Sequence, residues 1–427
     1  MSPASSSLQA VIDDALAATP PGRAVWVALS GGLDSCLLLT LAADACRRHP
    51  RPLRALHVHH GLQAAADDFE VHCRRLCSRL GVPLFVARAV VDAAAGRGLE
   101  GEARAARYAA LARRVGSGES LWLAQHRDDQ AETFLLAALR GAGPRGLAAM
   151  PRERGLAGAR LARPLLAHSR AELAAEAARR GLAWVEDPTN AETVQERNYL
   201  RHRVLPTLAH RWPHVGDALT RSARLSGEAD DLLEEFAAED LARLSGDPGR
   251  LPVAGLGALS PPRRRLLIRH GLDRQGLPRP PAARLAALLE QLEARRDAEV
   301  RVAWAGAEAR VWRGALYLLA PPRALPDGWA ADWDGRAPLE TPLGPVAVGL
   351  ERDDGAPARL RLAPRQGGER LRLAGRGGRD LKRLLQEWAL PPWERAGLVV
   401  AWHRDRPVAV GRPSGWLACA EGWRIRR

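Results

Sequence analysis

The first 200 or so residues alternate short apolar runs with longer stretches of helical spacing. The apolar runs predict buried strands over Ala24–Ser30, Leu53–His60, Pro83–Val90 and Ser120–Gln125. Apolar residues recur at i, i+3 and i+4 in four further segments, which predicts helices over Cys36–Arg48, Ala65–Leu80, Gly101–Val115 and Asp128–Arg140. Repeated strand–helix–strand units predict an α/β fold with a doubly wound parallel sheet, in which ligands bind beyond the carboxyl ends of the strands.

The hexapeptide SGGLDS, Ser30 to Ser35, follows the first predicted strand and opens the next predicted helix. Gly31 and Gly32 allow backbone torsions that turn N–H groups into the loop, Ser30 and Ser35 add hydroxyl donors, and the helix N-terminus adds positive potential. The loop, with Leu33 inside it, therefore predicts a receptor for pyrophosphate. Asp34 fits beside an anion if it binds Mg²⁺, which prefers a few carboxylates plus phosphate oxygens.

Two other kinds of glycine-rich turn bear on this interpretation. A Walker A loop needs Gly-Lys-Ser/Thr, and the only lysine is Lys382; a GxGxxG dinucleotide loop does not match either. An ordinary turn capped by Ser and Asp is the alternative that remains.

Polar residues also gather near the ends of the later strands. His57 and His60 end the second strand, where they suit nucleotide or metal contact or are simply solvated. Arg104, Arg107 and Tyr108 share a helix and either face a ligand or form ordinary surface pairs.

The segment AQHRDDQAET places further polar groups at the same sheet edge. His126, Asp128 and Asp129 follow the fourth strand, and Glu132 lies one turn into the next helix. Asp128 and Asp129 suit binding of metal–ATP or of an amine substrate. A second basic segment, ERNYLRHR, suits a triphosphate or an RNA backbone, with a solvated face as the alternative; its candidate residues are Arg197, Asn198, Arg201 and Arg203.

Composition narrows the class of protein. Hydrophobic residues make up 46% of the chain and no run approaches the roughly 18 apolar residues of a membrane span. The N-terminus lacks the basic segment followed by an apolar segment that marks a signal peptide, so we expect a cytoplasmic protein. The five cysteines are an odd number spread along a long chain without a CxxC pair, which argues against a disulfide framework or a zinc site.

The charge is concentrated in the tail. The net charge is +14, and from Pro357 onwards sixteen Lys and Arg face six Asp and Glu, so that +10 lies there. A basic tail predicts a nucleic-acid partner. The alternative is that the positive charge only reflects the arginine-rich composition of the whole chain and has no function.

Three domains are predicted: residues 1–214 with the nucleotide site, a mostly helical domain over 215–350, and a basic α+β domain over 351–427. In the middle domain we expect helices over Asp217–Ser245 and Pro280–Arg295, a hairpin of Glu299–Gly306 with Ala309–Leu319, and a linker over Pro321–Gly344.

These motifs resemble known ones. SGGLDS resembles the PP-loop of the ATP-pyrophosphatase superfamily, whose domain is adenine nucleotide alpha hydrolase-like. The whole ordered set, SGGLDS, HVHHGL, EARAARYAAL, AQHRDDQAET, RGAGPRGL, RPLL and EDPTN…ERNYLRHRVLP, resembles the tRNA(Ile)-lysidine synthetase family over about residues 23–210. Arg365–Val400 resembles the C-terminal tRNA-binding domain of that family.

The resemblance implies a reaction. ATP adenylates the C2 oxygen of the wobble cytidine in a CAU-anticodon tRNA(Ile), and the ε-amine of free L-lysine then displaces AMP from C2 to give lysidine, so that the tRNA reads AUA and is charged with isoleucine. It implies Mg²⁺ on Asp34 and Asp129, charge stabilisation by Arg104, Arg107, Arg197 or Arg203, and proton transfer by Asp128 or Glu132. The resemblance also implies substrate contacts at His57, His60, Tyr108, His126, Asn198, Arg201, Arg376 and Lys382.

Three alternative functions can be compared by the residues that each one requires. A tRNA thiolase with paired cysteines needs a CxxC or an equivalent, and an amidotransferase-coupled synthetase needs a nucleophilic cysteine near the N-terminus, whereas Cys36 lies inside the helix of the loop. A non-enzymatic RNA-binding protein would not need Ser30, Asp34 and Ser35 intact.

Overall fold

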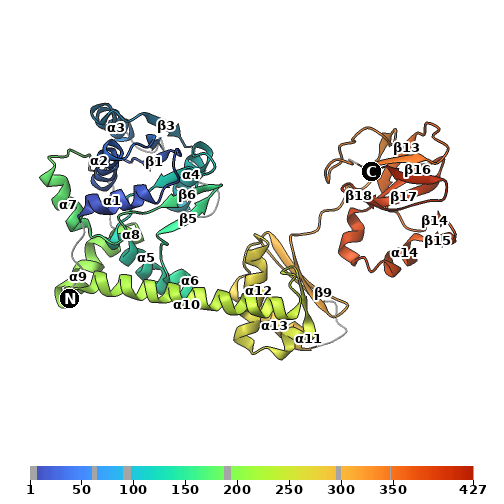
Figure 1. Ribbon diagram of the computed structural model, residues 1–427. Helices are drawn as coiled ribbons and strands as arrows, with labels where there is room; N and C mark the ends of the chain where they lie inside the picture. Colours follow the sequence, from blue (N-terminus) through green and yellow to red (C-terminus); the bar gives the residue numbers. More distant parts are fainter. Residues whose placement is uncertain are drawn as a thin grey trace. The chain divides into compact units, whose positions relative to one another are not determined.

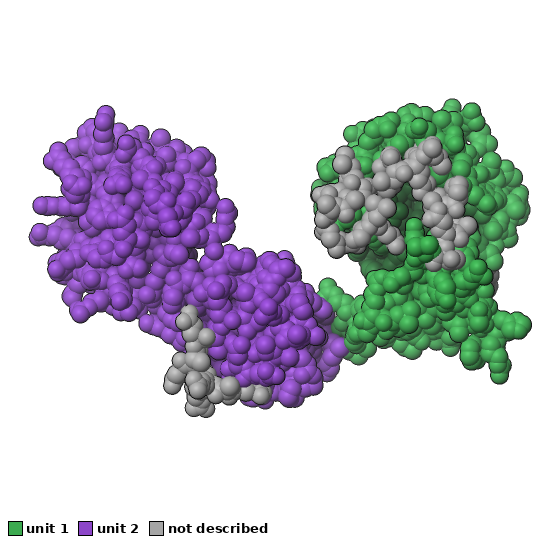
Figure 2. All heavy atoms as spheres, turned by 180° about the vertical axis from the view of Figure 1, so that it is seen from behind, with its two compact units in different colours: residues 1–232 green, residues 233–427 purple. Residues whose placement is uncertain are grey.

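The computed structural model describes residues 7–59, 65–89, 98–186, 194–294, 300–346 and 348–426. The chain forms two compact units, Met1–Leu232 and Leu233–Arg427, which Figure 2 shows in different colours. The domain limits expected near residues 214 and 350 stay predictions. Within the described ranges, none of the helices is both long and apolar enough to cross a membrane.

The first unit is built on a six-stranded sheet with the order β3-β2-β1-β4-β6-β5 (Figure 1). Its strands are β1 (Val25–Ala28), β2 (Leu53–His59), β3 (Leu84–Arg88), β4 (Ser120–Trp122), β5 (Glu153–Leu156) and β6 (Ala159–Ala162). β1 pairs in parallel with both β2 and β4, so the chain order reverses beside β1 and the doubly wound prediction is confirmed. The edge strand β5 is antiparallel to β6, and this hairpin was not predicted because its short strands carry no apolar run.

Helices pack around this sheet. They are α1 (Leu8–Ala17), α2 (Leu33–Arg48), α3 (Ala65–Leu80), α4 (Gly98–Arg114), α5 (Arg127–Leu139), α6 (Pro144–Leu147), α7 (Arg170–Arg179), α8 (Glu196–Tyr199) and α9 (Leu205–Arg211). One π-helical turn, η2 (Leu200–Val204), joins α8 to α9. The four predicted helices agree with α2, α3, α4 and α5 to within three residues at each end.

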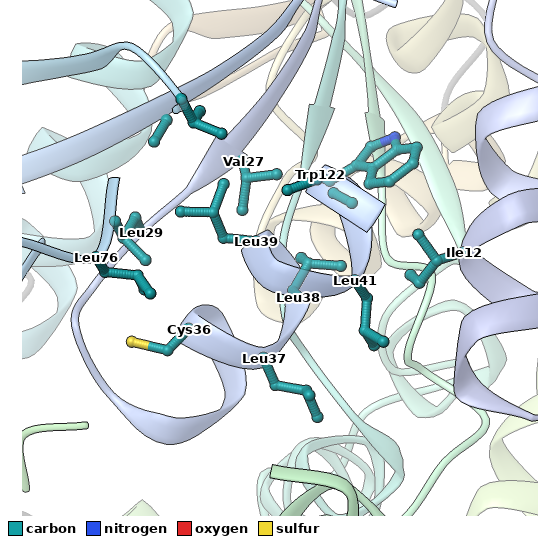
Figure 3. Packing of buried hydrophobic residues seen from close by; sticks show 14 of the residues in the cluster. Ile12, Val27, Leu29, Cys36, Leu37, Leu38, Leu39, Leu41, Leu76 and Trp122 are labelled. Atoms are coloured by element: carbon teal, nitrogen blue, oxygen red, sulfur yellow. The ribbon is translucent and has the colours of Figure 1, made fainter. Parts of the chain in front are cut away.

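Helix α2 lies in the middle of the main core, as Figure 3 shows. It contacts β1 as well as α1 and α7, so consecutive leucines are all buried. A helix that is apolar all round is stable only when neighbours cover it on every side. The loop that precedes α2 is therefore attached to one of the least mobile parts of the unit. All five cysteines of the chain are free thiols, and Cys36, Cys73 and Cys77 belong to this core.

Helix α10 (Val215–Leu244) runs from the first unit into the second. Three more helices and a four-stranded sheet follow: α11 (Val253–Ala258), α12 (Pro261–Arg274), α13 (Ala282–Ala294), β7 (Arg250–Pro252), β8 (Arg301–Trp304), β9 (Ala307–Trp312) and β10 (Ala315–Leu319). The prediction of one strand over Ala309–Leu319 is wrong, because the chain turns at Arg313 and Gly314, which both have positive φ.

The C-terminal part of the second unit carries a five-stranded antiparallel sheet with the order β11-β13-β16-β17-β18. The elements are β11 (Ala331–Trp333), β12 (Gly349–Arg352), β13 (Leu360–Pro364), β14 (Arg370–Leu373), β15 (Gly377–Asp380), α14 (Leu381–Glu387), η3 (Pro392–Gly397), β16 (Val399–His403), β17 (Arg406–Arg412), β18 (Gly415–Cys419) and β19 (Trp423–Arg426). β11 pairs with β13, so part of the predicted linker Pro321–Gly344 belongs to this sheet and that prediction is wrong there.

We expect Leu38→Ala to lower the free energy of unfolding of the first unit by about 2–5 kcal/mol, because Leu38 is 0% exposed in the core and its truncation leaves a cavity. Urea unfolding followed by circular dichroism measures the change. Leu139→Ala, at a side chain that is 75% exposed, is the control and should change stability by less than about 0.5 kcal/mol. Equal losses in the two variants would contradict this account of the core.

Candidate active site

A cleft of about 980 Å³ opens in the first unit at the carboxyl ends of β1, β2 and β4. Its wall includes Ser30 after β1, His59 at the end of β2 and His126 after β4. This is where an open parallel sheet binds ligands, next to the strand at which the chain order reverses. The site predicted at this edge of the sheet therefore coincides with a real cavity.

The SGGLDS loop is held by the hydroxyl of Ser35. Its Oγ accepts hydrogen bonds from the N–H groups of Ser30 (3.1 Å) and Gly31 (3.2 Å) and donates to the carbonyl of Gly32 (3.0 Å). The N–H groups of Ser30 and Gly31 therefore point to Ser35 in this conformation. The N–H groups of Leu33 to Ser35 start α2, and the first N–H groups of a helix have no acceptor within it, so they are the donors that remain for an anion.

Gly31 is required for two reasons. Its φ is +95°, and a Cβ there would lie 3.1 Å from Phe69 Cδ1 and 3.3 Å from Cys73 Sγ. A side chain at this position would be strained and would also push against α3. Gly31 thus shapes the loop without lining the cleft, whereas Ser30, Gly32, Leu33, Asp34 and Ser35 do line it.

The histidines of HVHHGL have different surroundings. His57 is buried and its Nδ1–H donates to the carbonyl of Leu29 (2.8 Å), the residue just before the loop. Burial lowers the pKa of His57, so the neutral ring is favoured. His59 Nε2 lies 3.1 Å from Asp67. His60 lies outside the described residues.

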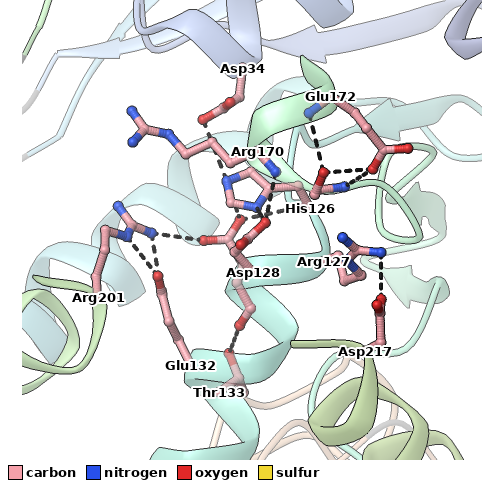
Figure 4. Close-up of polar contacts among 12 residues, drawn as sticks. Asp34, His126, Arg127, Asp128, Glu132, Thr133, Arg170, Glu172, Arg201 and Asp217 are labelled. Carbon is pink, nitrogen blue, oxygen red and sulfur yellow. Dashed lines mark hydrogen bonds and ion pairs between the residues drawn. The ribbon is translucent and has the colours of Figure 1, made fainter. Parts of the chain in front are cut away.

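Three carboxylates surround His126, which is 2% exposed at the N-cap of α5 (Figure 4). Its Nε2 lies 3.5 Å from Asp129 and 3.7 Å from Asp34, and its Nδ1 lies 3.6 Å from Asp128. Burial alone would lower the pKa of His126, but the three acids overcome it and the pKa is raised. The three acids thus stabilise the imidazolium form relative to a free histidine, and His126 joins the SGGLDS helix to α5.

The two neighbouring aspartates of α5 differ in role. Asp128 accepts a hydrogen bond from the backbone N–H of Arg170 (2.7 Å) and does not line the cleft. The His126 side chain, assisted by that N–H, lowers the pKa of Asp128 to about 2 in spite of burial. Asp129 lines the cleft, accepts from the N–H of His126 (3.0 Å) and contacts Arg201 (3.1 Å).

Glu132 is 0% exposed and bridges two arginines. Its carboxylate contacts Arg197 Nε at 2.7 Å and Arg201 Nε at 2.6 Å. Both arginines also line the cleft, while Glu132 does not. A buried carboxylate needs such compensation, so Glu132 fixes where the two guanidinium groups stand.

The remaining predicted residues fall into three groups. Arg104, Arg107 and Tyr108 of α4 line the cleft. Asn198 is buried and Arg203 is exposed, and neither lines it. Arg376 and Lys382 are exposed in the second unit, at the β14–β15 turn and on α14.

Asp34 offers an acceptor that suits a divalent cation. Asp34 Oδ1 is buried and has no hydrogen-bond partner among the described residues, and burial raises the pKa of Asp34 against the influence of His126 and Arg170. Groups of three or more His, Cys, Asp or Glu arranged to hold a metal do not occur in the described ranges. Mg²⁺ needs only one or two carboxylates when phosphate oxygens and water complete its shell, so Asp34 fits this ion.

Three family models match the chain in order. A PP-loop domain matches residues 4–208, a TilS substrate binding domain residues 251–317, and a TilS substrate C-terminal domain residues 360–422. The tRNA(Ile)-lysidine synthase of Xanthomonas axonopodis pv. citri is 46% identical over 413 residues, which cover 93% of this chain and 90% of that protein. The chain belongs to the tRNA(Ile)-lysidine synthase family.

Two further relatives belong to the same family. The tRNA(Ile)-lysidine synthases of Alkalilimnicola ehrlichii and Pseudomonas putida are both 43% identical, with 95% and 94% of this chain and 95% of each relative covered. A solved structure, the U34-tRNA thiolase NcsA from Methanococcus maripaludis with its [4Fe-4S] cluster, has a TM-score of 0.44 and 16% identity, and covers 51% of this chain and 77% of that one.

The cleft of this tRNA(Ile)-lysidine synthase family member also contains residues that were not predicted. Phe69, Arg170, Trp184 and His202 line it. Arg170 is the first residue of α7, after the Ser169 cap, and such a capping box is common at helix starts with no ligand nearby. The sequence carries no local signal that separates these residues from ordinary ones.

We expect Gly31→Ala to weaken ATP binding by about tenfold or more, because the added Cβ displaces the loop and small displacements in a site are costly. Isothermal titration with ATP measures the affinity. Gly22→Ala is the matched control: Gly22 also has positive φ, +73°, but nothing lies within 4 Å of its Cβ position. Unchanged ATP affinity in Gly31→Ala would refute this account of the loop.

Proposed function

We propose that the chain ligates free L-lysine to C2 of the wobble cytidine of the tRNA(Ile) with a CAU anticodon. ATP first adenylates the cytidine, and the products are lysidine, AMP and pyrophosphate, so that the tRNA reads AUA and is charged with isoleucine. The observation that carries the proposal is the relationship to tRNA(Ile)-lysidine synthases over more than nine-tenths of the chain. ATP use follows from the PP-loop domain and a tRNA substrate from the family.

The SGGLDS loop receives the phosphates of ATP in this proposal. The free N–H groups at the start of α2 and the hydroxyl of Ser30 supply donors, and Ser35 holds the loop in shape. Because α2 is fixed in the core, these donors stay in place as pyrophosphate leaves.

Asp34 is our candidate ligand for Mg²⁺, on the strength of its unpartnered Oδ1. When bound, the cation neutralises charge on the phosphate oxygens. Asp129 was also expected to hold it, but both of its oxygens already have partners in His126 and Arg201. We therefore favour Asp34 as the metal ligand.

Arginines supply the remaining positive charge. Arg104 and Arg107 stand on α4, and Arg197 is held by Glu132, so guanidinium groups line the cleft from two sides. Fixed charges stabilise a transition state without having to reorganise, which is how these residues would speed adenylation. Arg203 does not line the cleft and is less suited to this role.

The lysine substrate arrives as an ammonium and needs a carboxylate. Asp128 and Glu132 were expected to hold it, but neither lines the cleft, and a carboxylate with a pKa of about 2 is a weak proton acceptor. Asp129 lines the cleft, and each of its carboxylate oxygens keeps a second lone pair beside the contacts to His126 and Arg201. We propose that these lone pairs accept hydrogen bonds from the ammonium, while Asp128 positions His126.

The tRNA must present one base to this cleft. The wobble cytidine lies in a single-stranded loop, so it can turn outward without the melting of a helix. Arg376 and Lys382 are exposed on the basic C-terminal part, where they would contact phosphates away from the reaction.

Incubation with ATP, labelled lysine and bulk tRNA should label only the minor isoleucine tRNA and release equal AMP and pyrophosphate. Asp34→Asn should lower kcat/KM by about a hundredfold, because it removes the charge proposed to hold the metal. Asp14→Asn, an exposed acid of α1, should leave it unchanged. Labelling of no tRNA by the unaltered protein, or of tRNA at large, would overturn the proposed function.

The double variant Arg376→Ala/Lys382→Ala should bind tRNA more weakly and with a smaller salt dependence, by about 1.4 to 1.8 in the slope of log K against log salt. Filter binding at several salt concentrations measures this. Arg113→Ala/Arg179→Ala removes two exposed charges from the first unit as a control. If the Arg376→Ala/Lys382→Ala variant binds tRNA like the control variant, these two residues have no role in tRNA binding.

A further inference from the structure

Four arginines gather around one tyrosine beside the cleft, and we call them the arginine cage: Arg104, Arg107, Arg154 and Arg163, around Tyr108. Arg104, Arg107 and Tyr108 stand on α4, Arg154 on the edge strand β5, and Arg163 directly after β6. Figure 1 shows α4 beside the β5–β6 hairpin. The cage is thus built from segments that are up to 59 residues apart in the chain (Arg104 to Arg163).

Three guanidinium groups of the cage lie against the tyrosine ring. The distance from the guanidinium carbon to the ring centroid is 5.0 Å for Arg154, 5.4 Å for Arg104 and 5.8 Å for Arg107. All three side chains are exposed, so they can still meet a ligand. Stacking on a ring fixes a guanidinium plane while its N–H groups stay available.

The fourth arginine lies behind them. Arg163 is 2% exposed and donates to the amide oxygen of Gln125 and to the carbonyl of Pro151 (2.7 Å). Both acceptors are neutral. A buried guanidinium without a carboxylate keeps its full charge uncompensated, and this raises the positive potential at the surface above it.

No carboxylate pairs with any cage arginine in the described part of the chain. Other arginines of the same unit are paired: Arg180 with Asp44, and Arg197 and Arg201 with Glu132. Four like charges side by side repel one another, and an anion bound among them would relieve that repulsion.

The titration behaviour of the cage agrees with this geometry. Burial raises the pKa of Tyr108, but Arg104, Arg163 and Arg107 overcome it and the pKa is lowered. Although part of the Arg107 side chain is exposed, it lines the cleft, where surrounding protein atoms displace water and lower its pKa; the charges of Arg104 and Arg197 lower it further. The cage therefore favours any added negative charge.

The position of the cage favours a polynucleotide phosphate over a small anion bound inside the cleft. Arg104, Arg107 and Tyr108 line the cleft, but Arg154 and Arg163 do not, so the cage continues past the wall of the cleft. A small molecule held inside the cleft would not reach Arg154. A polynucleotide that places one nucleotide in the cleft must lead its backbone out of it, and its phosphates would pass such a place.

We propose that the arginine cage binds a backbone phosphate of the tRNA, next to the nucleotide that enters the cleft. Arg154 contacts the phosphate oxygens, while Arg104, Arg107 and Arg163 add positive potential from the cleft side and from behind. This inference rests on the proposed function, because it takes the tRNA as the substrate of this cleft.

Arg154→Gln tests the proposal, because Arg154 is exposed and lies outside the cleft, and no backbone bond depends on its side chain in the described residues. We expect the Kd for an unmodified tRNA(Ile) transcript to rise about tenfold. The slope of log K against log salt should fall by about 0.7 to 0.9, which a purely structural role would not cause. KM for ATP and for lysine should stay within about twofold of the unaltered enzyme. Arg154→Lys keeps the charge and should restore the slope.

Arg114→Gln is the matched control. Arg114 is also exposed on α4 and stacks on a ring, that of Phe85 at 4.5 Å, but it does not line the cleft. Its variant should bind tRNA with unchanged affinity and slope. If Arg154→Gln instead raises KM for ATP or lysine and leaves the Kd for tRNA unchanged, the phosphate assignment is overturned.

Lysidine formation by the unaltered enzyme is measured on the same tRNA. If lysidine forms and Arg154→Gln binds tRNA normally, only the cage inference fails. If the unaltered enzyme forms no lysidine, the proposed function fails and the cage inference falls with it.

Discussion

The wall of the cleft depends on the buried carboxylate of Glu132. It joins α5 to a segment more than sixty residues later through Arg197 and Arg201, with Asp129 as a second acceptor for Arg201. Removal of either side of such a buried network leaves an unpaired charge, which costs about 3–5 kcal/mol. The short helix α8 and the π turn after it contain few buried apolar residues of their own. Their position is therefore set mainly by charge, and so is the position of the two arginines that line the cleft.

A second constraint joins the loop to the core. Gly31 is closed in by Phe69 and Cys73, His57 holds the carbonyl before the loop, and α2 leaves the loop directly into buried leucines. The donors that we propose for phosphate are thus fixed by apolar packing, while the wall formed by Arg197 and Arg201 is fixed by ion pairs. Because ion pairs respond to salt and pH more than packing does, we expect the two walls to differ in sensitivity to solution conditions.

Much of this could be predicted from local sequence pattern. Strong apolar periodicity located α2 to α5, and the spacing of SGGLDS located the loop, because both signals lie within a few neighbouring residues. The sequence could not predict that Asp129 lines the cleft while Asp128 does not, since this depends on the orientation of α5 about its own axis. The β5–β6 hairpin was not predicted because its strands are short and charged. The positions of Arg154 and Arg163, which depend on this hairpin, were therefore not predicted either. The burial of Glu132 could not be predicted for a different reason, because its arginine partners are distant in the sequence.

The chain has a single lysine, Lys382, exposed on α14, and the cations that line the cleft are arginines and histidines. Guanidinium groups stay protonated at any physiological pH and do not act as nucleophiles, whereas a lysine amine that loses its proton does. The arginines around an activated cytidine in this cleft would thus supply positive charge that cannot attack it. Lysine is absent from the described lining of the cleft, so no lysine side chain there would compete with the free amino acid for the intermediate that we propose the arginines stabilise.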